Sequence, residues 1–82
     1  MITVYVLVGS KMRYVGITNN LQRRLREHKY KQSKGSQIIG DFKLLFFEEF
    51  PDYKSARARE KFFKSGVGRA WLDNYQKGQS QP

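Results

Sequence analysis

The feature that most constrains the fold is a pair of β-branched and aromatic runs near the start of the chain. Residues 2–8 read ITVYVLV and residues 12–17 read MRYVGI, with Gly9 and Ser10 in the short segment between them. Such residues favour extended backbone, and a Gly-Ser pair between two runs is a turn signal. The pattern predicts an antiparallel hairpin. Gly16, inside the second run, indicates a bulge or a close backbone approach.

The middle of the chain changes from a helical to an extended pattern. A first helix is expected to follow an N-cap at Thr18 or Asn19 and to continue to about Tyr30. Residues 31–41 are polar and contain glycine, which predicts a loop. Residues 42–50, FKLLFFEEF, predict a third strand, and its apolar residues on both faces predict burial on both sides.

The last third of the chain is expected to be helical. A Pro-Asp pair ends the third strand, a second helix covers residues 53–64, and a short last helix covers residues 68–75. Residues 77–82 are expected to form a flexible tail. The element order is therefore ββαβαα, which predicts an α+β domain with a small three-stranded antiparallel sheet flanked by helices. The 82 residues allow one such domain, which we place at residues 1–76.

Composition excludes several classes of protein. The chain has no cysteine and one histidine, so neither a disulfide framework nor a thiolate or polyhistidine metal site is expected. No apolar run approaches the roughly 20 residues that span a bilayer. The first residues lack the basic lead and small-residue cleavage site of a secretory signal. A soluble cytoplasmic protein is the expectation.

The charge of the chain favours an anionic partner. Sixteen Lys and Arg against seven Asp and Glu leave a net charge of +9. The segment 11–34 holds eight basic residues and a single acid, Glu27. Such a surface attracts phosphate backbones, so we expect nucleic-acid binding. The alternatives are a merely solubilising surface, contact with an acidic protein, or an anionic membrane, which would require a basic amphipathic helix with bulky apolar anchors.

Helical periodicity separates the basic residues of the first helix. Leu21 and Leu25 define its buried stripe, His28 falls within about 20° of Leu21, and Arg24 lies about 60° to the same side. Arg24 and His28 are therefore stacked at one edge of the buried face. A guanidinium fixed there suits contact with a phosphate whose charge grows in a transition state.

More ordinary roles remain open for these residues. Arg24 can extend along the apolar stripe with its charge in water, and His28 can be a hydrogen-bonded boundary residue. Arg23 and Arg26 point toward solvent, where they can meet a phosphate backbone.

The second helix places a carboxylate among apolar neighbours. Tyr53, Ala56, Glu60 and Phe63 share one face, at offsets of 3, 7 and 10 residues. A carboxylate there is costly unless an arginine, hydrogen bonds or a metal ion compensates it. Carboxylate oxygens suit Mg²⁺, which keeps most of its waters and shares substrate phosphates.

A salt bridge is the simpler explanation for Glu60. Arg57 and Lys64 are within pairing distance on the same helix, or Glu60 lies at the edge of the stripe. Glu48 and Glu49 are competing carboxylates at a strand end, where charged residues are ordinary.

Two strand tyrosines, Tyr5 and Tyr14, by themselves indicate packing. Together with the helices they give the chain a resemblance to the GIY-YIG nuclease family. VYV at residues 4–6 stands where that family has its first motif, and YVG at residues 14–16 where it has the second. Arg24 follows the second tyrosine by ten residues, as the family's helical arginine does.

The resemblance continues into the second helix. AREKFFKSGVGRAWL resembles the helix that carries the family's metal-binding glutamate, and Glu60 matches that residue. The resemblance covers about residues 3–75. The first motif lacks its glycine and the second has valine for isoleucine, and neither change removes a chemical group. The chain is most similar to the small stand-alone bacterial members related to the nuclease domain of the excision-repair protein UvrC, which associates it with DNA repair.

The resemblance implies a metal-dependent endonuclease that hydrolyses phosphodiester bonds in DNA, with RNA not excluded, and with structure selectivity or weak specificity. The catalytic residues it implies are Tyr5, Tyr14, Arg24, His28 and Glu60, with Glu60 holding Mg²⁺ or Mn²⁺. The residues expected to bind nucleic acid are Lys11, Arg13, Gly16, Arg23, Arg26 and Lys29. Family members often use an attached module to choose a site, so this chain is expected either to act without one or to use a partner protein. The alternative is a non-catalytic nucleic-acid-binding module on the same fold.

Overall fold

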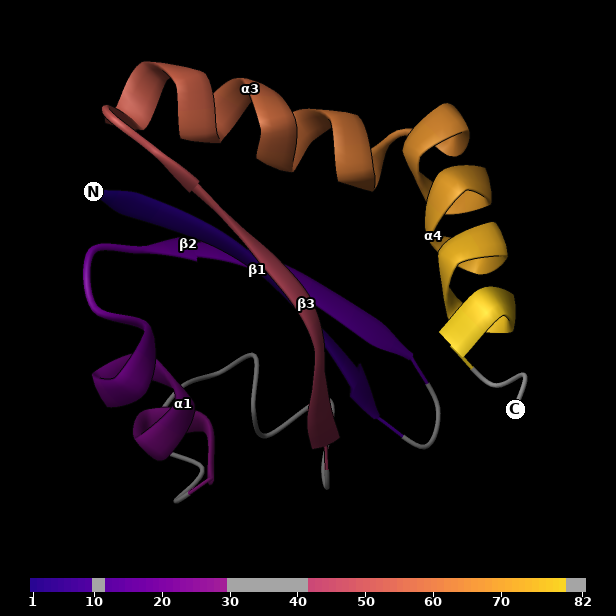
Figure 1. The fold of residues 1–82 in the computed structure, drawn as a ribbon, viewed down its shortest axis with the longest axis horizontal. Coiled ribbons are helices and arrows are strands. Elements are labelled where there is room, and N and C mark those ends of the chain that lie inside the picture. Colours follow the sequence, from indigo (N-terminus) through magenta and orange to yellow (C-terminus); the bar gives the residue numbers. More distant parts are fainter. Residues whose placement is uncertain (10–11, 30–41, 80–82) are drawn as a thin grey trace.

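The structure is a computed structural model that describes residues 1–9, 12–29 and 42–79 (Figure 1). The elements follow in the order β1 (Ile2–Gly9), β2 (Arg13–Thr18), α1 (Leu21–Lys29), β3 (Phe42–Phe50), α3 (Tyr53–Lys64) and α4 (Gly66–Gln79). The antiparallel three-stranded sheet and the ββαβαα order confirm the predicted α+β class.

Some expectations fall outside the described residues. These are the turn residue Ser10, the basic residue Lys11, the helix end at Tyr30 and the loop over residues 31–41. Within the described part of the chain, no helix has both the length and the apolar character needed to span a membrane.

β1 is the central strand of the sheet, in the order β2-β1-β3. It pairs antiparallel with both neighbours, so that Tyr5 lies opposite Gly16 of β2 and opposite Phe47 of β3. The backbone N–H of Gly9 donates to the carbonyl of Met12 at 2.8 Å, which closes the predicted hairpin. The sheet therefore has two edge strands, and β2 is one of them.

The central strand is buried on both faces. Val4 and Val6 pack in the cluster that includes Phe63 and Leu72 of α3 and α4, whereas Tyr5 and its neighbour Leu7 form a second cluster with Leu21 and Leu25 of α1. This alternation follows from the two-residue period of a strand. Helices α3 and α4 consequently cover one face of the sheet and α1 the other, as Figure 1 shows.

The prediction that β3 is buried on both sides is wrong. Leu44 is 37% exposed and Phe47 is 48% exposed, because β3 is an edge strand with one neighbouring strand. The strand that has both faces covered is β1. The register between β1 and β3 also shifts between Val6 and Leu7, which leaves Leu45 as an extra residue in β3.

The cap of α1 lies one residue later than predicted. The side chain of Asn20, rather than that of Thr18 or Asn19, accepts the backbone N–H of Arg23 at 3.0 Å. Thr18 instead orders the turn, since its hydroxyl accepts the N–H of Asn20 at 3.1 Å. Both contacts fix the angle at which the chain leaves β2 and enters α1.

A single serine joins α3 to α4. The Ser65 hydroxyl donates to the carbonyl of Phe62 at 2.6 Å and accepts the N–H of Gly68 at 3.1 Å, so it ends one helix and caps the next. Asp52 caps α3 at its start by accepting the N–H of Ser55 at 2.8 Å. α4 begins earlier than the predicted helix over residues 68–75 and runs to Gln79, into the segment expected as a tail.

The junction of α3 and α4 generates a stability prediction. A methyl group at Gly68 would overlap the backbone carbonyl of Phe62, which cannot move aside as a flexible side chain can, whereas one at Gly78 of the same helix meets nothing within 4 Å. We expect Gly68→Ala to lower the free energy of unfolding by about 1–3 kcal/mol. Gly78→Ala should leave it unchanged or raise it by up to about 1 kcal/mol. Urea unfolding compares the two, and equal effects would contradict this packing.

Candidate active site

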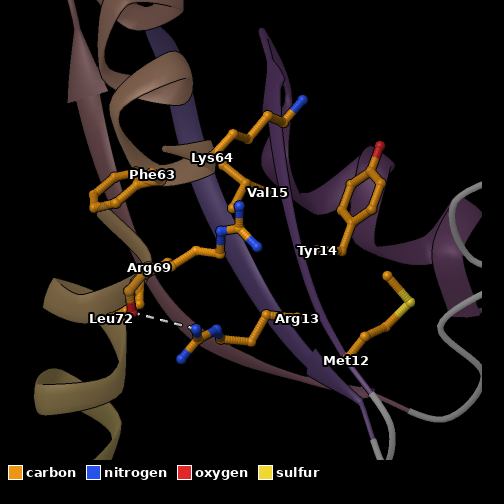
Figure 2. Close-up of a pocket in the computed structure, with 8 residues that line it drawn as sticks. All are labelled: Met12, Arg13, Tyr14, Val15, Phe63, Lys64, Arg69 and Leu72. Carbon is orange, nitrogen blue, oxygen red and sulfur yellow. Dashed lines mark hydrogen bonds between the residues drawn. The ribbon is translucent and has the colours of Figure 1, made fainter. Parts of the chain in front are cut away.

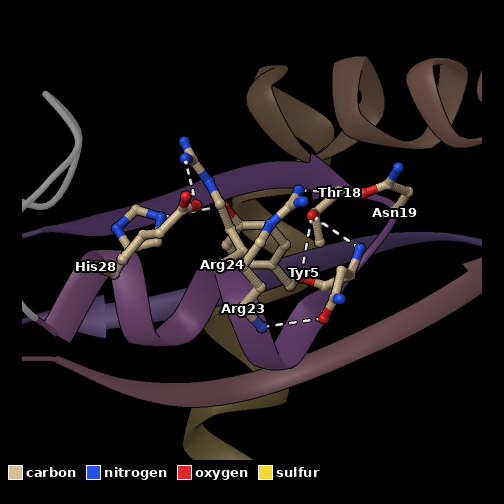
Figure 3. Close-up of polar contacts among 8 residues, drawn as sticks. Tyr5, Thr18, Asn19, Arg23, Arg24 and His28 are labelled. Carbon is tan, nitrogen blue, oxygen red and sulfur yellow. Dashed lines mark hydrogen bonds and ion pairs between the residues drawn. The ribbon is translucent and has the colours of Figure 1, made fainter.

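The Tyr5 hydroxyl lies at the centre of a polar network under α1. Tyr5 has no exposed surface. Its hydroxyl oxygen accepts a hydrogen bond from Nε of Arg24 at 3.2 Å and lies 3.1 Å from Nε2 of His28 (Figure 3). One atom on the central strand thus fixes two side chains that lie one turn apart on α1. This confirms that Arg24 and His28 turn toward the sheet.

Gly16 makes room for this network. A Cβ at Gly16 would lie 2.6 Å from the Tyr5 hydroxyl oxygen and 2.9 Å from the ring of Tyr14. The space that a side chain would occupy therefore holds two tyrosine rings, whose centroids are 6.1 Å apart. The packing of these two rings explains why β2 has a glycine at this position. Contact of Gly16 with nucleic acid stays a prediction.

His28 is a buried neutral imidazole. It is 1% exposed, and its ring meets the rings of Tyr5, Tyr14 and Phe42 edge to face. Burial lowers the pKa of His28, and the positive charge of Arg24 lowers it further. Its Nδ1 atom has no hydrogen-bond partner among the described residues. His28 therefore packs against both tyrosine rings and has almost no exposed surface, and its catalytic role stays a prediction.

The environment of Tyr5 keeps its hydroxyl protonated. Burial raises the pKa of Tyr5 to about 12, although the hydrogen bond from Arg24 opposes that rise. Tyr14, in contrast, is only partly buried. The two motif tyrosines thus have different surroundings, and only Tyr14 is open to a water molecule or a substrate.

The Arg24 guanidinium is held on two sides. Besides the Tyr5 hydroxyl, the Glu27 carboxylate accepts from Nη1 of Arg24 at 3.2 Å. The hydrogen bond to Tyr5 is the main cause that raises the pKa of Arg24 above its already high ordinary value. The side chain keeps 29% of its surface exposed, so it is both positioned and accessible. Its catalytic role stays a prediction.

The other basic residues divide into surface and structural groups. Arg23, Arg26 and Lys29 are exposed on α1, and the periodicity predicted this exposure for Arg23 and Arg26. Arg13 is different, because its guanidinium pairs with Asp73 of α4 at 2.7 Å and its side chain is only 19% exposed. Arg13 therefore ties β2 to α4, which limits its freedom to meet a phosphate.

Glu60 lies on α3, apart from the Tyr5 network. Its side chain is 16% exposed, and its carboxylate pairs with Lys64 at 3.2 Å. The salt bridge that the sequence left open is thus present, and it uses Lys64. The competing carboxylate Glu48 pairs with Arg59 at 2.8 Å, and Glu49 is exposed.

Two cavities lie along α3, and their lining residues help to locate Glu60 relative to the Tyr5 network. A polar cavity of about 280 Å³ is lined by Ile17, Thr18, Asn19, Arg23, Arg24, Glu27 and Tyr53. A larger one of about 450 Å³ is lined by Met12, Arg13, Tyr14, Val15, Phe63, Lys64, Arg69 and Leu72 (Figure 2). We call them the Arg24 cavity and the Tyr14 cavity. The start of α3 lies at the first and its end at the second, so α3 runs antiparallel along β2.

Glu60 falls between the two cavities. It follows Tyr53 by seven residues and precedes Lys64 by four, so all three lie within about 40° on one side of α3. Its Cα is about 10 Å along the helix axis from Tyr53. Its partner Lys64 lines the Tyr14 cavity, so the connection of Glu60 to that cavity runs through Lys64.

Residues 1–76 match the family model described as the GIY-YIG catalytic domain. The chain belongs to the GIY-YIG family. Its members are nucleases, so the domain is a nuclease domain by descent. Neither the curated proteins nor the solved structures gave a match.

The side chains of this GIY-YIG domain that could bind a metal ion fit an ion that is held jointly by the protein and by the substrate. Among residues 1–9, 12–29 and 42–79, no three His, Cys, Asp or Glu side chains are grouped to hold a metal ion. Glu60 offers one carboxylate. Mg²⁺ commonly binds through one or two carboxylates, waters and substrate phosphates, so a single partly buried carboxylate fits that mode.

Sequence reasoning missed three residues that border the GIY-YIG site. Glu27 pairs with Arg24, Tyr53 lines the Arg24 cavity and Lys64 lines the Tyr14 cavity. Signals were present for all three, since Lys64 follows Glu60 by four residues and was already named as a possible partner of it. Glu27 is the single acid of the basic segment and follows Arg24 by three residues, and Tyr53 shares its helix face with Glu60.

The buried His28 predicts a pH effect on stability. A histidine in the unfolded chain gains a proton below about pH 6.5, whereas burial makes the folded imidazole resist protonation. The unfolded state then binds more protons, so the free energy of unfolding should fall as the pH drops below about 6.5.

Urea unfolding at about pH 7.5 and about pH 5.5 measures this difference. His28→Leu removes the one histidine of the chain and should flatten the pH dependence between these values. The same pH dependence in both proteins would show that His28 is not the responsible group.

Proposed function

We propose that this chain is a divalent-metal-dependent endonuclease that hydrolyses phosphodiester bonds in DNA. The observation that carries the proposal is the placement of Arg24, whose guanidinium is fixed by a buried tyrosine and still opens into a cavity. The net charge of +9 favours a polyanionic substrate. Fixed positive charge beside an accessible edge strand suits stabilisation of a phosphate in its transition state.

Arg24 is assigned to the phosphate whose ester bond breaks. A guanidinium donates to two phosphate oxygens at once, and its charge offsets the negative charge that develops there. In the free protein Glu27 occupies part of this guanidinium at 3.2 Å. Because Glu27 is about one third exposed, an arriving phosphate can replace it without opening the core.

The two tyrosines receive different roles. Tyr5 is inaccessible and its pKa is raised to about 12, so it acts as the positioning residue for Arg24 and His28. Tyr14 is the accessible phenol, and we assign to it the proton of the attacking water. A positioned phenol within reach of the attacking water can take part in its proton transfer.

Glu60 is assigned to a divalent cation, Mg²⁺ or Mn²⁺. When bound, such an ion supplies Lewis-acid stabilisation of the phosphate and of the departing oxygen. The carboxylate of Glu60 is partly buried and is preoriented by Lys64 at 3.2 Å. Lys64 is 57% exposed and can turn away from Glu60 toward a phosphate without disturbing α3.

The surface of α1 supports backbone contact rather than base reading. Arg23, Arg26 and Lys29 are exposed there and can each meet a flanking phosphate. We accordingly propose structure-selective or weakly specific cleavage, with RNA as a possible second substrate and a partner protein that supplies site choice. The two tyrosine motifs and the two helices are the basis for placing the chain near the cytoplasmic stand-alone members related to UvrC.

Replacing the Glu60 carboxylate is the sharpest test of the proposed metal-dependent cleavage. Glu60→Gln should reduce cleavage of labelled duplex, flap, branched and single-stranded DNA in Mg²⁺ or Mn²⁺ by about 10²-fold or more, because the metal loses its protein ligand. Salt-sensitive DNA binding should persist. EDTA should abolish wild-type cleavage.

Glu49→Gln is the matched control, because it makes the same change of charge at an exposed carboxylate of β3. It should cleave as the wild type does. An equally active Glu60→Gln protein would overturn the metal assignment. Salt-sensitive binding of every DNA without cleavage by the wild type would instead favour a binding module.

A further inference from the structure

Helix α3 carries much more positive than negative charge. Its twelve residues include five basic side chains and one acid, Glu60. One of the five, Arg59, pairs with Glu48 of β3 at 2.8 Å. The other four are exposed to solvent, and they are Lys54, Arg57, Lys61 and Lys64. We call these four residues the α3 stripe.

The α3 stripe lies along one side of the helix. Its residues follow one another at intervals of 3, 4 and 3 positions, so at about 100° per residue they fall within about 80° of one another. The buried residues Ala56 and Phe63 lie about 130° from the centre of the stripe. At a rise of about 1.5 Å per residue the stripe is about 15 Å long. It is therefore a narrow row of cations that faces solvent.

Three of the four cations have no partner in the described part of the chain. Lys64 pairs with Glu60 at 3.2 Å. Within residues 1–9, 12–29 and 42–79, the side chains of Lys54, Arg57 and Lys61 make no ion pair. Their charges are consequently available to an anionic partner without the loss of an internal contact.

Local helix energetics do not favour this arrangement of charges. Arg57 and Lys61 are like charges four residues apart, and such pairs repel each other on a helix. Lys54 lies in the first turn, where the helix dipole favours negative groups. Glutamates between these residues would keep the helix soluble and would also stabilise it. The stripe therefore points to an anionic partner that offsets the repulsion.

The α3 stripe begins beside the proposed phosphate site. Tyr53, which precedes Lys54 in the chain, lines the Arg24 cavity together with Arg24. At the far end of the stripe, Lys64 is the partner of Glu60. In Figure 1, α3 starts near the end of the sheet where β2 leads into α1 and runs to the junction with α4. A strand whose reacting phosphate lies at Arg24 can thus continue along the stripe.

We propose that the α3 stripe binds the sugar-phosphate backbone of the nucleic acid that leaves the Arg24 cavity, as a second phosphate-binding surface besides α1. This assignment rests on the proposed nuclease function. The length of about 15 Å matches the rise of about four nucleotides of one strand. The contacts reach phosphates and no base edges, so the stripe adds affinity and orientation without a sequence preference.

The position of the stripe also constrains the path of the substrate. Helices α1 and α3 cover opposite faces of the sheet. A nucleic acid that contacts the basic residues of both helices must therefore pass around the edge of β2. The α3 stripe consequently contacts a part of the substrate that the exposed residues of α1 do not reach.

The side chains around the stripe favour nucleic acid over an anionic membrane. Between Lys54 and Lys64, the exposed residues of α3 include no bulky apolar side chain. The apolar residues Ala56 and Phe63 are fully buried, so they cannot anchor the helix in a bilayer. A narrow row of cations without such anchors fits one polyanionic strand.

The salt dependence of DNA binding by the full-length protein tests the stripe in a variant that combines Arg57→Gln with Lys61→Gln. Fluorescence anisotropy of a labelled duplex, in EDTA, gives the slope of the logarithm of the binding constant against the logarithm of the salt concentration. Loss of two phosphate contacts should lower the magnitude of this slope by about 1.8. Binding at about 0.1 M salt should weaken about 10- to 100-fold. Lys54→Gln alone should lower the slope by about 0.9.

The matched control combines Lys43→Gln with Lys77→Gln, because it removes the same charge at exposed positions of β3 and α4. It should keep the wild-type slope. An equal loss of slope in both double variants, or an unchanged slope in the α3 variants, would overturn the proposal. A loss of binding to phosphatidylserine vesicles, with DNA binding unchanged, would also overturn it and assign the stripe to a membrane.

The stripe and the nuclease assignment fail in different ways. At saturating protein, the variant with Arg57→Gln and Lys61→Gln should cleave DNA in a single turnover as fast as the wild type, because neither residue is placed at the cleaved phosphate. A slower step at saturation would contradict a role in binding alone. An unchanged salt slope with Glu60-dependent cleavage would leave the nuclease standing without the stripe. A lowered slope, with no DNA cleaved by the wild type, would leave the stripe standing without the nuclease.

Discussion

The contacts of the Tyr5 hydroxyl position Arg24 and His28 of α1 against the sheet. This one oxygen accepts from Arg24 at 3.2 Å and lies 3.1 Å from His28, so it connects the central strand to two consecutive turns of the helix. The network depends on Gly16, because any larger residue there would displace the tyrosine ring. A buried phenol with a raised pKa keeps its proton, and a protonated phenol is what this bridging position requires.

The second constraint is that β2 is an edge strand. Beside this strand, Tyr14 lines the same cavity as Lys64 of α3, and Lys64 is the ion-pair partner of Glu60. Arg13 holds α4 against this strand through Asp73 at 2.7 Å. A polyanion that lies along the edge would therefore meet fixed positive charge on one side and a carboxylate with its lysine on the other.

Much of the fold was predictable because local patterns and tertiary structure agree. The strand at residues 42–50 and the helix at residues 53–64 have the predicted bounds, since a Pro-Asp pair with a capping carboxylate marks the boundary between them. The burial of β3 was mispredicted for a physical reason. Apolar residues on both faces of a strand show that other parts of the chain could cover both faces. Which strand is covered on both faces depends on the order of the strands in the sheet, and that order is not a local property of the sequence.

The candidate site was predictable in part. Helical periodicity placed Arg24 and His28 on the inward edge, and the structure confirms both positions. The engagement of Arg13 by Asp73 could not be foreseen, because residues 60 positions apart in sequence carry no local signal of pairing. The cavity across β2 was hidden for the same reason, since its walls come from β2, α3 and α4.

We propose that Tyr5 positions the site while Tyr14 takes part in the reaction. Single-turnover cleavage by Tyr5→Phe and Tyr14→Phe, on one labelled DNA substrate and at saturating metal, tests it most directly. Tyr14→Phe should lose about 10²- to 10⁴-fold in the cleavage step. Tyr5→Phe keeps the buried ring and should lose clearly less, because Arg24 retains its charge and its contact with Glu27. The opposite order, with Tyr5→Phe inactive and Tyr14→Phe active, would contradict the account.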